Sequence, residues 1–263
     1  MNYKEICNSV ELLARTVGDK IQQLRAEGQL VVEAKGHNDF VTQMDKLSER
    51  MLVDGLAKIV PEAGFIAEES TRTDRGAVYN WIVDPIDGTT NFIHGVAPYC
   101  ISIGLAESET IVVGVIYELV HREMFTAWKD GGAYLNGTRI HVSEAPTVSQ
   151  SLLITGFPVY DLSRAKEFLG ALDELMQKVH AVRSIGSAAA DMAFVAAGRY
   201  DAFFEYNLKP YDVAAGCILV SEAGGKICDF RGGNDYLFGK EIIATNSKNH
   251  CEFAEIVARH MNK

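Results

Sequence analysis

The sequence is poor in cysteine and in basic residues, and it contains no long apolar run. Its five cysteines, at positions 7, 100, 217, 228 and 251, are odd in number and widely spaced, with no C-x-x-C pair. This spacing indicates neither a disulfide framework nor a zinc site. The 25 Lys and Arg are outnumbered by 35 Asp and Glu, which gives a net charge of −10. Because an acidic chain is a poor electrostatic partner for a polyanion, we do not expect a nucleic-acid partner.

No segment approaches the roughly 18 apolar residues that a membrane helix needs. The first 20 residues are mixed and charged, without the apolar centre of a signal peptide. We therefore expect no membrane partner and a cytoplasmic location. Hydrophobic residues make up 48% of the chain, which excludes a disordered protein, and the 23 glycines follow no G-X-Y repeat, which excludes collagen. The composition predicts a soluble, compact, acidic protein.

Residues 1–146 are predicted to form an α+β half. Apolar side chains recur every three or four positions over 6–24 and again between 42 and 61, which indicates two amphipathic helices. Short strand-like runs follow, with Asn136-Gly137 as a hairpin turn. These runs cover residues 64–67, 79–83, 99–105, 110–117 and 123–127. We expect two helices packed on an antiparallel sheet.

Residues 147–263 are predicted to form an α/β half, because strands and helices alternate there. The expected strands are 152–155, 181–184, 201–205 and 241–244. The expected helices are 162–179, one that opens at Gly186, one that opens at Pro210, and 248–260. The two halves would share one compact body with a border near residue 146.

The densest chemical signal is the segment that runs from Asp84 to Asn91. An apolar strand ends in Asp84, and Asp87 follows three positions later across a proline. Proline followed by Asp-Gly is also ordinary type I turn chemistry, but a turn requires neither the first carboxylate nor the two threonines behind Gly88. Two carboxylates around one bend can bind one hard cation such as Mg²⁺. The amides of Gly88, Thr89 and Thr90 would face an anion, so the segment predicts a metal and phosphate site.

Four other acidic residues, at three places in the sequence, have ordinary local explanations. Glu68 and Glu69 follow a strand, where an acidic pair is usually a solvated loop. Asp45 follows Thr42 by three residues, as in a helix capping box. Asp212 stands at a helix start, where a negative charge complements the helix dipole. Taken singly, none of these positions indicates a function.

Several segments together resemble the inositol monophosphatase family of the magnesium-dependent, lithium-sensitive phosphatase superfamily. The segment Asp84-Pro-Ile-Asp-Gly-Thr-Thr-Asn-Phe is similar to the first family signature, and the segment from Lys209-Pro-Tyr-Asp to Gly225 is similar to the second. The blocks that end at Asp45 and that contain Glu68-Glu69, and those that begin at Gly186 and Gly198, match in the same order. The resemblance covers nearly the whole chain. It implies a layered αβαβα sandwich of the inositol monophosphatase and fructose-1,6-bisphosphatase type.

The resemblance implies two to three Mg²⁺ ions. Glu68, Asp84 and the carbonyl of Ile86 match the first site. Asp84, Asp87 and Asp212 match the second site, so that Asp84 would bridge two ions. Glu68 with waters matches a weaker third site.

The resemblance also implies roles in catalysis and substrate binding. Asp45, Glu68 and Thr89 match the residues that orient the attacking water. The residues that match substrate contacts are Asp87, Gly88, Thr89, Gly186, Ser187, Ala188, Glu205 and Asp212. Among these, the amides of Gly88 and Thr89 match phosphate contacts, and Glu205 matches a contact to substrate hydroxyls. Residues 35–38 match a mobile loop over the site.

The function implied is the Mg²⁺-dependent hydrolysis of a phosphate monoester, with myo-inositol monophosphate as the first substrate and a metal-activated water attacking in line. A small phosphorylated polyol and a second copy of the chain in a homodimer are the implied partners. The alternatives within the superfamily are a fructose-1,6-bisphosphatase or a 3′(2′),5′-bisphosphate nucleotidase with the same metal residues. An alternative from another class is a non-catalytic regulatory binding protein.

Overall fold

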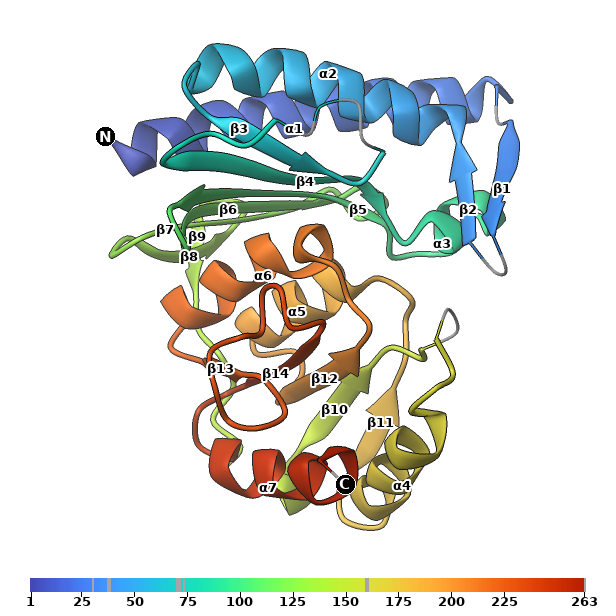
Figure 1. Ribbon diagram of the computed structural model, residues 1–263, viewed down its shortest axis with the longest axis vertical. Coiled ribbons are helices and arrows are strands. Elements are labelled where there is room, and N and C mark those ends of the chain that lie inside the picture. Colours follow the sequence, from blue (N-terminus) through green and yellow to red (C-terminus); the bar gives the residue numbers. More distant parts are fainter. Residues whose placement is uncertain (30, 37–38, 70–71, 73, 159–160, 263) are drawn as a thin grey trace.

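The structure, a computed structural model, describes residues 1–29, 31–36, 39–69, 72, 74–158 and 161–262. Five layers follow one another along the long axis of the molecule (Figure 1): two helices, a seven-stranded sheet, two central helices, a five-stranded sheet, and two further helices. This is the αβαβα sandwich that the family resemblance implied. No helix among the described residues is long and apolar enough to cross a membrane.

The seven-stranded sheet and its outer helices come from the first part of the chain. The outer helices are α1 (Tyr3–Ala26) and α2 (Gln43–Ile59). The strands, in spatial order, are β3 (Gly64–Ala67), β4 (Tyr79–Asp87), β5 (Cys100–Glu107), β6 (Thr110–Glu118), β7 (Glu123–Trp128), β8 (Gly132–Leu135) and β9 (Thr138–Ile140). The expectation of a wholly antiparallel sheet was wrong, because β3 and β4 run parallel.

Three short elements of this part were not predicted from the sequence. They are the hairpin of β1 (Val32–Gly36) and β2 (Asp39–Thr42) and the helix α3 (Thr89–His94). The segment 35–38, expected as a mobile loop, begins within β1, and its residues 37 and 38 lie outside the described part of the chain.

The second part of the chain forms the other three layers. Its strands have the spatial order β11 (Ala181–Arg183), β10 (Leu152–Thr155), β12 (Ala202–Tyr206), β14 (Glu241–Thr245) and β13 (Lys226–Cys228), and β14 runs antiparallel to both of its neighbours. The central helices are α5 (Ala188–Ala196) and α6 (Pro210–Glu222), and the outer helices are α4 (Ala165–Met176) and α7 (His250–Met261). A 3₁₀ turn, Val148–Gln150, precedes β10. The division of the chain at residue 146 stays a prediction.

The alternation of side chains along the strands decides which residues face the central helices. On β4, Trp81 and Val83 join the apolar cluster under α1 and α2, whereas Ile82 joins the cluster around α5 and α6. On β12, Phe204 packs toward α4 and α7, and Phe203 packs toward α5. Because side chains alternate along a strand, Asp84 and Glu205 both face the central layer.

Two paired glycines let helix α6 lie close against the seven-stranded sheet. Gly104 on β5 stands directly opposite Gly114 on β6. A Cβ added at Gly114 would lie 2.4 Å from the Cγ2 atom of Ile218, and one added at Gly104 would lie 2.9 Å from the Cβ atom of Ala214. The absence of side chains at this pair fixes the depth of α6 and, with it, the position of Asp212.

We predict that Gly114→Ala lowers the free energy of unfolding by about 1–3 kcal/mol, because overpacking displaces the helix from the sheet. Urea unfolding measures this loss. Gly55→Ala on α2 is the matched control, since the three atoms nearest to its new Cβ all belong to the flexible side chain of Leu13, and alanine is the better helix former by about 1 kcal/mol. Equal effects of the two substitutions would contradict the prediction.

Candidate metal and phosphate site

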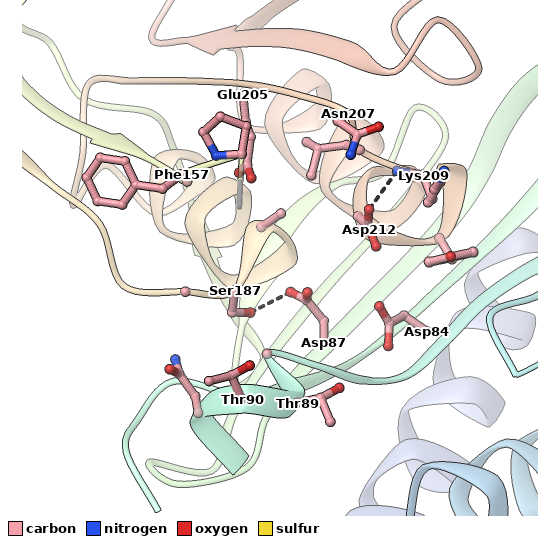
Figure 2. Close-up of a pocket in the computed structure, with 18 of the residues that line it drawn as sticks. Asp84, Asp87, Thr89, Thr90, Phe157, Ser187, Glu205, Asn207, Lys209 and Asp212 are labelled. Atoms are coloured by element: carbon pink, nitrogen blue, oxygen red, sulfur yellow. Dashed lines mark hydrogen bonds between the residues drawn. The ribbon is translucent and has the colours of Figure 1, made fainter. Parts of the chain in front are cut away.

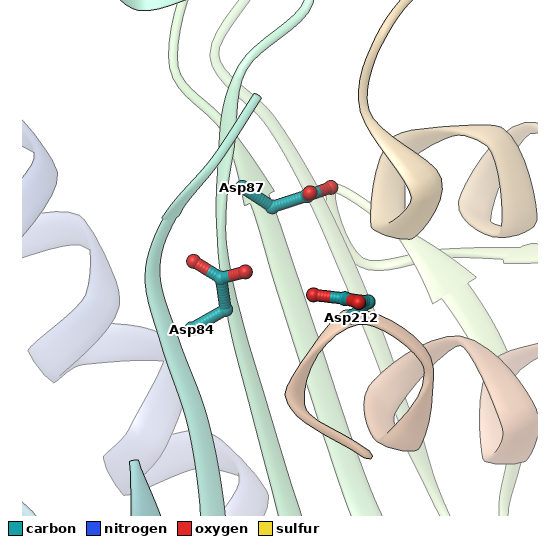
Figure 3. Close-up of side chains that lie close together, drawn as sticks. All are labelled: Asp84, Asp87 and Asp212. Atoms are coloured by element: carbon teal, nitrogen blue, oxygen red, sulfur yellow. The ribbon is translucent and has the colours of Figure 1, made fainter. Parts of the chain in front are cut away.

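Three carboxylates converge where the seven-stranded sheet meets the central helices. Asp84 and Asp87 come from β4, and Asp212 comes from the first turn of α6. One carboxylate oxygen of each lies within 4.8 Å of the others, and Figure 3 shows the three side chains turned toward one another. The structure therefore brings together three of the metal ligands that the sequence predicted, from segments more than 120 residues apart.

A β-bulge allows Asp84 and Asp87 to face the same side. Strand β4 was expected to end at residue 83, but it continues through Pro85 to Asp87. Asp84 is opposite Ser102 on β5, and Asp87 is opposite Cys100, so three steps on β4 match two on β5. In a regular strand, residues three apart point to opposite faces. The extra residue in β4 turns Asp87 to the same face of the sheet as Asp84. The sequence analysis had expected a tight bend at this place.

Glu68 reaches Asp84 because β3 and β4 are parallel. Ala67 is in register with Val83, so the residues that follow them leave the sheet together. The amide of Glu68 donates to the carbonyl of Val83 at 3.2 Å. Burial, followed by repulsion from Glu68, Asp87 and Asp212 and a side-chain hydrogen bond with Glu68, raises the pKa of Asp84 well above its usual range.

The N-terminus of helix α5 holds Asp87. The hydroxyl of Ser187 donates to the Oδ2 atom of Asp87 at 2.5 Å, and the amide of Ala189 donates to the same atom at 2.8 Å. Both donors favour the charged carboxylate. Burial nevertheless raises the pKa of Asp87 above its usual value. Two of the predicted substrate contacts, Ser187 and Ala188, thus belong to the turn that positions a predicted metal ligand.

Asp212 is fixed by the start of its own helix. Pro210 occupies the first turn of α6, and the amide of Lys209 donates to the Oδ2 atom of Asp212 at 2.6 Å. Burial first, and then the negative charge of Asp87, raises the pKa of Asp212 well above its usual range.

The donor set of this cluster fits a divalent cation. The three clustered aspartates all have raised pKa values, since burial disfavours their charged forms and, at Asp84 and Asp212, neighbouring carboxylates add to this effect. A cation between them would supply the missing positive charge, and a site built only from oxygen donors suits Mg²⁺ better than softer metals. Glu68 and Ile86 line the same cavity as the three aspartates and could supply further oxygen ligands. The residues present therefore fit the metal that the family resemblance implied.

Asp45 and Thr89 form the hydrogen-bonded pair that the resemblance implied. The Oδ2 atom of Asp45 accepts bonds from the amide and the hydroxyl of Thr42, at 2.7 and 2.5 Å. The hydroxyl of Thr89 contacts the Oδ1 atom of Asp45 at 3.3 Å and the carbonyl of Ile86 at 3.0 Å. Burial raises the pKa of Asp45. The capping-box explanation of Asp45 is thus also correct, and one carboxylate serves both the helix start and Thr89.

Tight turns bring Gly88 and Gly186 together opposite the carboxylates. Gly88 has a φ of +87°, and a Cβ there would lie 3.1 Å from the carbonyl oxygen of Gly186. Asn91 joins the two turns, because its side-chain amide donates to the carbonyls of Pro98 and Ile185 at 2.8 and 2.6 Å. Helix α3 begins at Thr89, and the first amides of a helix have no intrahelical acceptor. The first amides of α3 are therefore placed where they could bind an anion.

The site opens into a cavity of about 770 Å³ between the two sheets. Figure 2 shows Asp84, Asp87 and Asp212 at one side of it and Glu205 at another. The predicted site residues that line it are Glu68, Asp84, Ile86, Asp87, Gly88, Thr89, Gly186, Ser187, Ala188, Glu205 and Asp212. Asp45 is not among the lining residues, but it is hydrogen-bonded to Thr89, which lines the cavity.

Glu205 and the metal ligands are coupled through charge. Withdrawal from water and the negative charge of Asp87 raise the pKa of Glu205 to about 8, although the amide of Gly156 lowers it by donating to the carboxylate. A cation bound at Asp87 would remove part of this repulsion. The charged form of Glu205 is therefore favoured when the metal site is filled.

The sequence analysis missed several residues of this region. Phe157, Asn207 and Lys209 line the cavity beside the predicted residues. Asp191, within the otherwise apolar helix α5, is 1% exposed, and neither of its carboxylate oxygens has a hydrogen-bond partner among the described residues. The signal for Asp191 in the sequence was an aspartate that directly follows three consecutive alanines. Burial first, and then Glu205 and Asp87, raises its pKa well above the usual range.

We predict that Asp191→Asn raises the free energy of unfolding at pH 8 and leaves it nearly unchanged at pH 4. An acid with a raised folded-state pKa keeps its proton in the fold after the unfolded chain has lost it, so stability falls as pH rises above about 4. Because asparagine cannot ionise, the variant does not lose free energy of unfolding in this way as pH rises. Urea unfolding with chelator present measures both values.

The exposed Asp54 on α2 provides the matched control for this experiment. Asp54→Asn should leave the pH dependence of stability unchanged. The same pH dependence in wild type and in Asp191→Asn would show that the buried carboxyl carries no such penalty.

Comparison with known proteins gives one consistent result. The inositol monophosphatase family profile matches residues 2–262. Nus factor SuhB of Escherichia coli (strain K12) is 41% identical over 217 residues, which cover 81% of this chain and 80% of that protein. The structure of extragenic suppressor protein suhB from Bartonella henselae superimposes with a TM-score of 0.90 at 38% identity, over 95% of this chain and 97% of that one. Thermotoga maritima IMPase superimposes with a TM-score of 0.86 at 34% identity, over 96% of each chain.

The family match spans almost the entire chain, and the layered fold and the acidic cluster agree with it. The chain belongs to the inositol monophosphatase family.

Proposed function

We propose that this protein is a Mg²⁺-dependent phosphatase that hydrolyses the phosphate monoester of a small cyclic polyol, with myo-inositol monophosphate as the first candidate. The observation that carries the proposal is the arrangement of one cavity: a cluster of three aspartates at one side and the separate carboxylate of Glu205 at another. The aspartate cluster fits a metal-bound phosphate, and the carboxylate of Glu205 fits hydroxyl groups.

Asp84, Asp87, Asp212 and Glu68, with the carbonyl of Ile86, would hold two to three Mg²⁺ ions. These ions would supply the positive charge that lowers the pKa of a water, neutralises the phosphoryl oxygens and stabilises the leaving oxygen. Without them, the acidic cluster repels an anionic substrate. Metal is therefore required for substrate binding as well as for the chemical step.

Thr89 and Asp45 would orient the attacking water. The hydroxyl of Thr89 can accept a hydrogen bond from water while it donates its own hydrogen to the buried carboxylate of Asp45. Glu68, which is hydrogen-bonded to Asp84, would hold the second hydrogen of the water. Such fixed orientation favours in-line displacement, since the nucleophile and the leaving oxygen must lie on opposite sides of phosphorus.

The turn that precedes α3 would bind the phosphate oxygens through the amides of Gly88 and Thr89. The substrate hydroxyls would bind Glu205 and the turn formed by Gly186, Ser187 and Ala188. The pairing of Ser187 with Asp87 couples this turn to the metal ligands, so a correctly placed substrate and a correctly placed metal reinforce each other.

We predict that Asp84→Asn lowers kcat/KM by about 100-fold or more, because a lost charged ligand in a two-metal site costs several kcal/mol of transition-state stabilisation. Phosphate release from myo-inositol 1-phosphate measures this loss. The variant should also lose the rise in melting temperature that Mg²⁺ gives the wild type. Activity within a few-fold of wild type would exclude a two-metal mechanism.

The exposed Asp173 on α4 provides a control with the same change of charge. Asp173→Asn should retain full activity and the response to Mg²⁺. Chelator should abolish the activity of both the wild type and this control.

We predict that Glu205→Ala costs about 1.5–3 kcal/mol in kcat/KM for inositol phosphate, through the loss of charge-assisted hydrogen bonds to two hydroxyls. The loss should be much smaller for glycerol 2-phosphate. Activity on fructose 1,6-bisphosphate and adenosine 3′,5′-bisphosphate should fall less or rise, since a like charge is removed. An equal loss on every substrate would instead assign Glu205 to the metal site or to the fold.

The same substrate panel distinguishes the alternatives. A preference for a bisphosphate would favour a fructose-1,6-bisphosphatase or a bisphosphate nucleotidase. The curated relative from Escherichia coli is named as a factor rather than as an enzyme, so the second candidate is a non-catalytic binding or regulatory role. Absence of metal-dependent phosphate release from the whole panel would favour that role. The homodimer and the cytoplasmic location stay predictions.

A further inference from the structure

One exposed aromatic ring stands at the wall of the cavity. Phe157 is 52% exposed, although phenylalanine is normally among the buried residue types. Among the large exposed apolar side chains of the described residues, Phe157 alone also lines the cavity that holds the acidic cluster. Part of its exposed surface therefore lines the cavity, where a ligand can cover it.

The ring of Phe157 contacts an aromatic residue of the outer core. Phe157 makes an edge contact with Phe168 of helix α4, with ring centroids 6.4 Å apart at 79°. Phe168 is 1% exposed and stacks on Phe204 of strand β12 at 5.3 Å and 29°. Because Phe168 and Phe204 are packed in the outer core, they fix the direction of Phe157 and leave part of its surface open.

Phe157 and Glu205 line the same cavity and are linked through Gly156. Gly156 precedes Phe157, and its amide donates to Glu205. A Cβ at Gly156 would lie 2.1 Å from the Oε2 atom of Glu205, so only glycine permits this approach. Figure 2 shows Phe157 and Glu205 on the side of the cavity away from Asp84. The leaving group of a phosphate held at the aspartates would extend toward both.

We propose that Phe157 is a specificity-determining residue, whose ring covers the apolar face of a cyclic polyol while Glu205 binds the hydroxyls at its edge. This inference rests on the proposed phosphatase function and specifies its substrate class. A saturated ring carries hydroxyls around its edge and C–H groups on its faces. An aromatic ring removes such a face from water, whereas an acyclic polyol offers no comparable flat surface.

A nucleoside is the other kind of leaving group that an aromatic ring could stack upon, because every base has a π face. Glu205 favours the polyol, since a carboxylate accepts hydrogen bonds from neighbouring hydroxyls but contributes nothing to stacking. The cavity therefore combines an apolar platform with a hydroxyl acceptor, which together match a polyhydroxylated ring.

Kinetics of Phe157→Ala test the proposal. We expect KM for myo-inositol 1-phosphate to rise about tenfold, the upper range for an aromatic contact, while kcat changes less than about twofold. KM for the acyclic glycerol 2-phosphate should change less than about twofold. Phe157→Tyr, which keeps the ring, should restore the wild-type KM, and Phe157→Leu, which keeps only apolar bulk, should not.

Phe238→Ala is the matched control, because Phe238 is also a half-exposed phenylalanine, at 46%, and does not line the cavity. It should leave both KM values unchanged, and melting temperatures with chelator should match for all variants. Equal changes of KM on cyclic and acyclic substrates, or no change on the cyclic one, would overturn the role of Phe157 while the phosphatase function stands. A larger effect on adenosine 5′-monophosphate than on inositol phosphate would overturn the polyol as occupant. If wild type releases phosphate from none of these substrates, the proposed function fails and this inference fails with it.

Discussion

Repulsion among carboxylates at one point of the fold is the constraint on which the rest of the structure depends. One carboxylate oxygen each of Asp84, Asp87 and Asp212 lies within 4.8 Å of the others. Burial raises the pKa values of all three, and repulsion from neighbouring carboxylates raises those of Asp84 and Asp212 further. Each is restrained by a backbone amide, which prevents the acids from turning apart. Such an arrangement is unfavourable alone and becomes favourable when a cation is shared. The fold thus concentrates negative charge at a place where a divalent cation would neutralise it.

The cluster exists only because two distant segments pack together. Strand β4 supplies two acids, and helix α6 supplies the third from the central layer. The glycine pair Gly104 and Gly114 sets how deeply α6 lies against the sheet. The N-terminus of α5 then bonds Asp87 from the other side. Packing between the layers, rather than any single motif, therefore determines the geometry of the site.

The sequence predicted the positions of helices and strands better than the way in which they pair and pack. Periodicity located α1, α2 and most strands, because apolar side chains must face a core. It could not reveal that β3 and β4 are parallel, since pairing direction depends on partners outside each strand. The motif around Asp84 was recognised, but the bulge that turns Asp87 to the same face depends on the register with β5. Asp191 and Phe157 were missed because their significance comes from neighbours that are distant in sequence.

The cavity separates two tasks that require different physical properties. The acidic side needs oxygen ligands at fixed positions, and it draws them from a strand bulge and a helix start, where backbone amides limit movement. In the proposed function, the side near Glu205 distinguishes leaving groups, and it combines a carboxylate with an aromatic ring that contacts the outer core. The two sides remain linked, because the charge of Asp87 raises the pKa of Glu205. A cation at Asp87 would favour the charged form of Glu205, so in the proposed function metal binding and substrate selection are parts of one electrostatic system.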